Sequence, residues 1–404
     1  MVRHGSFPPK QRQLTLTDAV LALTCLTPFL VPFSLAQNID LQALVLIMTG
    51  GVAWYDVWRS RRHYPLPRWP SIAIATYLFF CALSLIIHPS FLNVFGTKLV
   101  RLGTLELVAC VGCGMTLRKL TATKVSVWFY VTSVLLAITT LPFHFFTTGH
   151  LTRLGGVFHQ ADILAVWMAI GFILGLSLWK PHVRQRVYIA IGQVLLATIL
   201  LLSQTRAIIA ILILIIFIMI LRSSMNWRKH VIVGILALAC IAVGVIDTKA
   251  ISPSRITDVS FAGESITYRL SLQSFAVKAL INNPLWGYGA GSLPLVLACP
   301  TLHNAALQAT CHEGHYFDSS HNIFLDRFLA FGWLGGLAFA TLVIMTLIKG
   351  LRNVGFERYF AYCVLLISLY YFTNVTSMTV ELLLWVFMLR VWKPHKTSRA
   401  SASR

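Results

Sequence analysis

Charged side chains are scarce in this sequence, and acidic side chains are the scarcest. Asp, Glu, Lys and Arg make up 11% of the 404 residues, with 13 acidic residues against 33 Lys and Arg. Soluble domains carry about 25% charged residues. With 57% hydrophobic residues and a mean hydropathy of +0.75, the chain cannot have water as its main solvent. The composition therefore excludes an ordinary soluble domain and predicts an integral membrane protein.

Long apolar stretches set the expected fold. About 20 apolar residues span a bilayer core of about 30 Å, and lipid offers no partner for backbone amides, so the stretches must be helices. We expect an all-α polytopic membrane protein, one domain over 1–404. The start of the chain is basic but has no small-residue cleavage site, so the first helix should remain as an anchor. The twelve predicted helices are 18–36, 39–57, 71–88, 99–117, 125–146, 161–179, 187–202, 206–221, 231–247, 322–348, 359–373 and 377–392.

The net charge of +20 could indicate nucleic-acid binding, but its distribution indicates topology instead. With the N-terminus in the cytoplasm, 24 of the 33 Lys and Arg fall on inward segments and 9 on outward ones. This is the positive-inside bias of membrane proteins, and anionic lipid headgroups attract the same residues. We expect membrane lipids as partners, no nucleic acid, and a multi-pass protein of the inner membrane.

The cysteines divide by position. Cys299 and Cys311 fall together on the outward side, where an oxidising periplasm would permit a disulfide, although two free thiols are equally consistent with the sequence. The others lie inside predicted helices, where a free thiol behaves as a small apolar residue; they are Cys25, Cys81, Cys110, Cys113, Cys240 and Cys363.

One outward loop, 248–321, is long, and long loops without simple structure usually carry function. Within this predicted periplasmic loop, 264–282 has the pattern of an amphipathic helix lying against the membrane surface or the bundle. Arg269 lies on its apolar side, about 180° from Lys278. An arginine there requires an anionic partner, which could be a ligand or a carboxylate such as Asp258; a snorkelling side chain is the alternative.

Further cations lie on the outward side: Lys98 and Arg101, on one face at the mouth of the fourth predicted helix, Arg153, and Arg206, which opens the eighth. Each alone is commonly an interfacial anchor. Together, Arg and Lys side chains at a membrane surface suit a phosphate or pyrophosphate. Glu106, two turns into the fourth helix, should face the bundle and find a partner there.

The outward histidines do not indicate a metal site. His312 and His315 lack the spacing that puts both imidazoles on one helical face, so we expect neither a metal nor another cofactor. His321 stands at the outward start of the tenth predicted helix, with Ser320 as the expected cap. An imidazole there could take a proton from a hydroxyl; a capping or interfacial role is the alternative.

Four segments in order resemble motifs of the O-antigen ligase and polymerase superfamily. Leu151-Thr152-Arg153-Leu154-Gly155-Gly156-Val157-Phe158 resembles its R-x-x-G-x-F segment, although Gln160-Ala161-Asp162 follows where P-N is usual. Ser203-Gln204-Thr205-Arg206 is similar to S-x-S-R. Arg269 with Asn283-Pro284-Leu285-Trp286-Gly287-Tyr288-Gly289 resembles R…P-[LI]-x-G-x-G. His321-Asn322-Ile323-Phe324-Leu325 with Gly332-Trp333-Leu334-Gly335 resembles H-N-x-[FY]-L…G-x-x-G.

The resemblance implies a glycosyltransferase with its active site facing the periplasm. The donor would be an undecaprenyl-pyrophosphate-linked glycan, and for a ligase the acceptor would be a sugar hydroxyl of lipid A–core, without nucleotide sugar or metal. The family's functional residues carry over to His321, Arg269 and Arg206 as catalytic, and Arg153, Lys98 and Arg101 are expected to bind substrate. A single displacement would invert the anomeric centre.

The motifs leave the acceptor open. A polymerase would use a second lipid-linked glycan, and a protein O-oligosaccharyltransferase would use Ser or Thr; the compact chain without an appended soluble domain favours the ligase. A non-enzymatic lipid-linked oligosaccharide transporter would instead place charges along a midplane cavity and often show inverted repeats. Here the unusual charges gather on one side of the membrane, which favours an enzyme.

Overall fold

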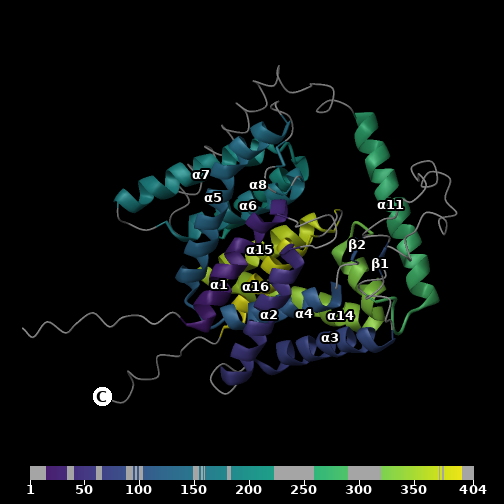
Figure 1. Ribbon diagram of the computed structural model, residues 1–404. Coiled ribbons are helices and arrows are strands. Elements are labelled where there is room, and N and C mark those ends of the chain that lie inside the picture. Colours follow the sequence, from purple (N-terminus) through teal and green to yellow (C-terminus); the bar gives the residue numbers. More distant parts are fainter. Residues whose placement is uncertain are drawn as a thin grey trace, which may run out of the picture.

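The computed structural model describes residues 15–33, 41–60, 66–87, 94–95, 98–99, 103–148, 154–155, 158, 160–179, 183–222, 259–289, 320–372, 374 and 377–393. Within these ranges the chain is helical, apart from one antiparallel hairpin of two-residue strands (Figure 1). The all-α prediction is therefore confirmed for the described residues. In chain order the elements are α1 (Leu16–Leu26), the 3-10 helix η1 (Thr27–Phe33), α2 (Leu41–Ser60), α3 (Arg68–Ile87), β1 (Val94–Phe95), β2 (Lys98–Leu99), α4 (Gly103–Leu117), α5 (Ala122–Thr148), α6 (Ala161–Ser177), α7 (Val183–Leu202), α8 (Arg206–Leu221), α11 (Val259–Asn282), α14 (Ile323–Arg352), α15 (Phe356–Tyr370) and α16 (Met378–Val391).

The predicted membrane helices each overlap one of these elements, except 231–247, which lies outside the described residues. The short break between α7 and α8 is present, with Arg206 as the first residue of α8. Helices α2, α5, α7 and α14 are long and apolar enough to cross a membrane. The protein is thus an integral membrane protein, while the number of twelve crossings remains a prediction.

The start of α4 differs from its prediction. Lys98 was expected on a helical face with Arg101, but it lies in strand β2, opposite Phe95 of β1, and α4 begins only at Gly103. The predicted shared helical face is therefore wrong for Lys98, and Arg101 lies outside the described residues.

Helix α6 forms the centre of the bundle. It packs against α5, α7, α8, α15 and α16, and every residue from Ile163 to Leu176 is buried. A helix that is apolar on all sides is expected in such an interior position. The described cysteines, Cys25, Cys81, Cys110, Cys113 and Cys363, are buried free thiols, as predicted for cysteines inside the helices.

Charged residues inside the bundle are paired or face inward. Arg327 of α14 and Glu381 of α16 form an ion pair whose side chains are 5% and 3% exposed. Glu106 of α4 is 1% exposed, so its predicted orientation toward the bundle is confirmed. Because charges are costly in lipid, this burial among helices is the arrangement expected of intramembrane ionisable residues.

Basic side chains tie the helices together at one end of the bundle. Lys124 at the start of α5 pairs with Asp18 of α1, and Lys119 pairs with Asp56 near the end of α2. Arg390 near the end of α16 donates to the Arg118 carbonyl at 2.6 Å. This end is the one predicted to face the cytoplasm, so α4, α6, α8, α14 and α16 all begin toward the opposite end.

Candidate functional site

The start of α14 holds His321 in an unusual backbone conformation. Its φ is +60°, a value that a residue with a β-carbon rarely adopts. Hydrogen bonds fix the residues on either side of His321 and so stabilise this backbone conformation. Ser320 donates from its backbone nitrogen at 2.8 Å and from its hydroxyl at 2.6 Å to the same Asp326 carboxylate oxygen. On the other side, the Ile323 amide donates to the Tyr371 carbonyl at 2.8 Å.

Asn322, not Ser320, caps this helix. Its side-chain oxygen accepts from the backbone nitrogens of Phe324 at 3.0 Å and Leu325 at 3.2 Å. The expected Ser320 cap is wrong, because the Ser320 hydroxyl is held by Asp326 one turn into the helix. Asn and Ser are equally good caps, so sequence alone could not choose between neighbouring positions.

The His321 imidazole is half-buried and lies within electrostatic reach of residues from two other elements. Burial and the positive charge of Arg269 lower its pKa to about 4, and the Asp162 carboxylate opposes this shift. Both causes of the lowering disfavour the charged imidazolium, whereas an adjacent carboxylate favours it. At neutral pH the ring is therefore neutral, with a nitrogen lone pair available to accept a proton.

Asp162 connects the imidazole to the turn that carries Arg206. It lies in the first turn of α6, and its carboxylate accepts from the Thr205 hydroxyl at 3.2 Å. Thr205 is the N-cap residue of α8, so the exposed Arg206 follows it directly. Asp162, in the segment that departs from the family pattern, thus contacts the turn before Arg206. Its carboxylate also acts on the charge of the His321 ring.

Arg269 reaches the site from α11. This helix was predicted over 264–282 and extends over Val259–Asn282. It packs on α14 through a small apolar cluster in which Ala276 and Leu280 contact Leu329. Arg269 is half-buried and near enough to His321 to affect its pKa. The predicted alternative partner, Asp258, lies outside the described residues.

A break in α14 anchors the segment that follows α11. Gly332 has φ +67° and ψ −174°, which interrupts the helix and frees backbone groups to bond elsewhere. The Tyr288 and Gly289 amides donate to the Leu329 and Ala330 carbonyls at 2.7 and 2.9 Å, and the Trp333 amide donates to the Pro284 carbonyl at 2.8 Å. The two glycine motifs noted in the sequence therefore meet and fix α11 against α14.

Of the six predicted site residues, the structure places Arg269 within electrostatic reach of His321. Arg206 follows Thr205, whose hydroxyl donates to Asp162, and the Asp162 carboxylate also acts on His321. Lys98 lies in strand β2. Arg101 and Arg153 lie outside the described residues, as do His312 and His315.

Sequence reasoning missed Asp162 as a site residue and Asp326 as the residue that fixes His321. The signal for Asp162 was its place in a segment that departs from the family pattern. Asp326 offered a weaker signal, as a carboxylate in the first turn of a predicted membrane helix. Among the residues that the structure describes, no three His, Cys, Asp or Glu side chains are grouped so as to hold a metal ion.

The arrangement suits an anionic ligand. The starts of α6, α8 and α14 meet here, and helix N-termini present unpaired amides and the positive end of the helix dipole. The Arg269 guanidinium adds positive charge close to a neutral imidazole. Arg206 begins α8 directly after Thr205, which donates to Asp162. Such a site can bind a phosphate-containing group and place a nearby hydroxyl against a base.

Comparison with known families agrees with this chemistry. Residues 191–340 match the family model described as O-antigen ligase (Wzy_C). This segment of the chain therefore resembles an O-antigen ligase domain. The match begins within α7, covers α8 and α11 and ends within α14, so it includes Arg206, Arg269 and His321. No curated protein matches the chain.

The O-antigen ligase domain confirms the superfamily that the four sequence motifs indicated. Members of this family are glycosyltransferase-like enzymes, and lipid-linked glycans are their general class of partner. Lys98, Arg101, Arg153 and Asp162 lie before the matched residues. The family match therefore supports Arg206, Arg269 and His321 as site residues more directly than it supports the residues that lie before the matched range.

Proposed function

We propose that this protein is an O-antigen ligase of the bacterial inner membrane. It would transfer a glycan from undecaprenyl pyrophosphate to a sugar hydroxyl of lipid A–core, at the periplasmic side and without a metal. The observation that carries the proposal is the proximity of Arg269 to His321, with Arg206 on the turn that contacts Asp162, in a segment that matches this family.

The two arginines would act on the leaving group. As the bond between the sugar C1 and the phosphate oxygen breaks, the electron pair stays on undecaprenyl pyrophosphate and its negative charge grows. Cations fixed in advance stabilise that charge without reorganising during the reaction. Arg206 and Arg269 supply them, and guanidinium groups bind phosphate oxygens in a bidentate manner. Arg153, Lys98 and Arg101 would contribute to holding the substrates.

His321 would act on the acceptor. The acceptor oxygen forms the new bond to C1 from the face opposite the pyrophosphate, and its proton passes to the neutral imidazole. A single displacement of this kind inverts the anomeric centre. The bound pyrophosphate would favour the imidazolium, as the Asp162 carboxylate does, because negative charge near an imidazole raises its pKa. Donor binding would thus make His321 a stronger base.

The decisive experiment supplies separate acceptors to one preparation. Purified protein in nanodiscs receives undecaprenyl-pyrophosphate-linked glycan together with lipid A–core, a second lipid-linked glycan, or a Ser/Thr peptide. The ligase proposal expects glycosylated lipid A–core only. Longer lipid-linked glycan would instead identify a polymerase, and a modified peptide would identify a protein transferase.

Variants connect the reaction to the site. His321→Ala and Arg206→Ala should each lower the transfer rate by about 10²-fold or more, since each removes a group acting in the transition state. Arg352→Ala, at the other end of α14, should transfer normally and serves as the matched control. Normal transfer by His321→Ala would remove the imidazole from the mechanism. Loss in all three variants would point to a general defect in folding.

A further inference from the structure

The turn between α7 and α8 determines where Arg206 lies. Gln204 has φ +55°, a value that residues other than glycine rarely adopt, and Thr205 and Arg206 follow it. The Leu154 amide donates to the Leu202 carbonyl at 3.2 Å, which holds the turn from one side. Thr205 is 5% exposed and is held from another side by a side-chain hydrogen bond. The start of α8 is therefore set by contacts of this turn with other parts of the chain.

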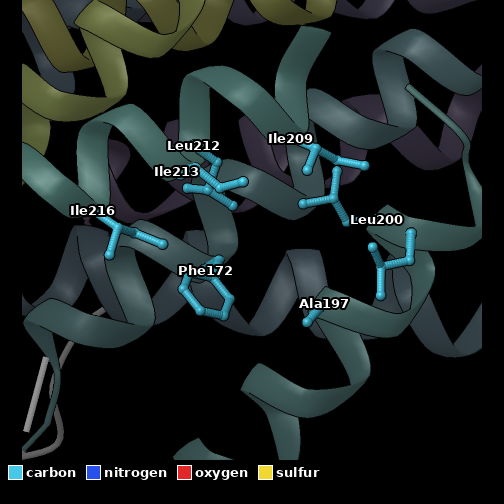
Figure 2. A pocket seen from close by; sticks show the side chains of 8 residues that line it. Phe172, Ala197, Leu200, Ile209, Leu212, Ile213 and Ile216 are labelled. Atoms are coloured by element: carbon cyan, nitrogen blue, oxygen red, sulfur yellow. The ribbon is translucent and has the colours of Figure 1, made fainter. Parts of the chain in front are cut away.

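Apolar packing between α7 and α8 is incomplete beyond the turn. The two helices and Phe172 of α6 line an apolar crevice of about 350 Å³ including its open mouth. Figure 2 shows side chains of α8, among them Ile209 and Leu212, on one side and Ala197 and Leu200 of α7 on the other. Apolar contacts also have no preferred direction. We therefore expect polar contacts at the turn to fix how α8 begins.

The polar contact at the turn is a hydrogen bond to α6. The hydroxyl of an N-cap threonine usually accepts from an amide in the first turn of its own helix. Thr205 is the N-cap residue of α8, but its hydroxyl makes no such bond and donates instead to the Asp162 carboxylate at 3.2 Å. The Ser203 carbonyl, at 3.4 Å and without charge, is the weaker acceptor. The Thr205 hydroxyl therefore joins α8 to α6 and does not cap α8.

The same carboxylate reaches the surroundings of His321. It acts on the charge of the imidazole from the start of α6, and Arg269 acts on it from α11. Tyr371 of α15 is 1% exposed and lies within electrostatic reach of Asp162, and its backbone carbonyl accepts from the Ile323 amide at 2.8 Å. Helix α15 packs against both α6 and α14. Asp162 thus contacts one part of the site and acts electrostatically on the other.

We propose that Asp162 is a positioning residue with two separable roles. Its hydrogen bond to Thr205 fixes Arg206 where the pyrophosphate binds, and its negative charge stabilises the imidazolium that His321 forms on taking the proton of the acceptor. The carboxylate takes no proton itself, because that proton moves only from the acceptor oxygen to the imidazole. The inference rests on the proposed function, since it uses the roles given there to Arg206 and His321.

Binding of undecaprenyl pyrophosphate to the protein in nanodiscs tests the first role. Thr205→Val removes the hydroxyl and keeps nearly the same shape, so it should raise the Kd about tenfold, as expected for the loss of a hydrogen bond to a charged group. Thr205→Ser retains the hydroxyl and should bind like the wild type. Asp162→Asn retains an acceptor oxygen and removes a charge that repels pyrophosphate, so its Kd should be unchanged or lower.

Thr198→Val is the matched control for the loss of a threonine hydroxyl. The Thr198 hydroxyl donates to the Val194 carbonyl within α7 at 2.9 Å and joins no two helices. The Kd of this variant should equal that of the wild type. Equal Kd values for Thr205→Val and Thr205→Ser would show that the contact with Asp162 does not position Arg206.

Deuterium exchange at the C2 hydrogen of His321, followed by mass spectrometry over a range of pH, tests the second role. The measurement is made in Arg269→Gln, because loss of this cation raises the pKa of His321 toward neutral pH. Adding Asp162→Asn should lower that pKa by about 1 pH unit, since a nearby carboxylate favours the imidazolium. Adding Thr205→Val should leave it unchanged. An unchanged pKa with Asp162→Asn would remove the second role.

The exchange measurement uses neither donor nor acceptor, so this inference and the proposed function can fail separately. A wild-type protein that does not bind undecaprenyl pyrophosphate would contradict the proposed function and, with it, the first role of Asp162. The effect of Asp162→Asn on the pKa of His321 would still decide the second role.

Discussion

At His321, the backbone conformation and the charge of the ring are set by different neighbours. Asp326 and the Tyr371 carbonyl fix the residues on either side, so that a positive φ is retained. Burial and Arg269 keep the imidazole neutral, against the opposing effect of Asp162. Substitutions at Asp326 should therefore alter the backbone geometry at His321, whereas substitutions at Arg269 or Asp162 should alter the protonation of its ring.

Asp326 provides a test of geometry. Asp326→Ala removes both hydrogen bonds from Ser320, and the misplaced imidazole should lower the transfer rate by about 10²-fold. Asp326→Asn retains an oxygen that can accept both bonds, so it should transfer much faster than Asp326→Ala. Mapping diethyl pyrocarbonate modification of His321 gives a second readout, which should accelerate in Asp326→Ala alone. Equal rates for both variants would mean that charge, not hydrogen bonding, matters here.

The pH dependence provides a test of protonation. Because the pKa of His321 in the free protein is about 4, kcat/KM should not fall with a midpoint near 6.5 as the pH is lowered. The Arg269 cation lowers the pKa of His321, so Arg269→Gln should raise that pKa. The acid limb of the residual activity of this variant should therefore move toward neutral pH. Asp162→Asn removes an opposing carboxylate and should move that limb to lower pH. A wild-type midpoint near 6.5 would contradict the assignment.

Sequence alone indicated which residue types form the site, but not the contacts that set their properties. Arg206 and His321 could be singled out because each stands at the start of a predicted membrane helix, and Arg269 because it lies on the apolar side of an amphipathic helix. Their catalytic roles were expected from the family resemblance. The roles of Asp162 and Asp326 depend on contacts between α6, α8 and α14 or within one turn. Such contacts depend on packing, which local patterns do not encode.

At the scale of elements, the glycines of α14 and of the segment after α11 fit against each other. A β-carbon on Gly332 would lie 2.1 Å from the Leu285 carbonyl oxygen, and one on Gly287 would lie 2.4 Å from the Leu329 oxygen. Both glycines also have φ of +67°, which favours glycine on conformational grounds. The position of Arg269 beside His321 therefore depends on two residues with no side chains.

Gly332→Ala should separate α11 from α14. Positive φ with ψ near 180° is a conformation that essentially only glycine adopts, and it alone costs about 1–3 kcal/mol for a residue with a β-carbon. The clash with Leu285 adds to this cost. We expect a lower melting temperature in detergent and loss of transfer. Gly51→Ala in α2 is the control, since nothing lies within 4 Å of its added carbon, and helix propensity should make it neutral or slightly stabilising. A stable, active Gly332→Ala would show that this contact is dispensable.

Elements were more predictable than their packing. Hydropathy located the described membrane helices because a span must be long and apolar, and it found the break before Arg206. It misplaced Lys98, since a short hairpin leaves no trace in a hydropathy average. It also could not show how α7 and α8 pack on their neighbours, because both are largely apolar and can pack in several ways.

For the whole molecule, the two ends of the bundle differ in how their charges are held. Fixed basic residues join helix ends at one side, and the candidate site lies at the other. Positive residues are retained in the cytoplasm during insertion. The proposed orientation therefore puts Asn282, at the end of α11, outside the cell membrane and Val354, after α14, inside it.

Cysteine labelling in intact cells tests this orientation. The described cysteines are buried, and replacing Cys240, Cys299 and Cys311 leaves a low background. A membrane-impermeant maleimide that passes the outer membrane should label Asn282→Cys in intact cells, whereas Val354→Cys, where the native side chain is 75% exposed, should react only after the inner membrane is opened. The reverse pattern would invert the topology and move the site to the cytoplasm.

The Arg327–Glu381 pair also has a consequence for how the chain is made. Arg327 leaves the ribosome before its partner, so α14 must enter the bilayer with an uncompensated charge near its first turn. The synthesis of α16 supplies the compensating carboxylate and completes the bundle. In a chain that ends after α15, the Arg327 guanidinium would lack the Glu381 carboxylate. We expect membrane-bound proteases to degrade such a chain. Quality control could thus distinguish complete chains from truncated ones before any substrate is bound.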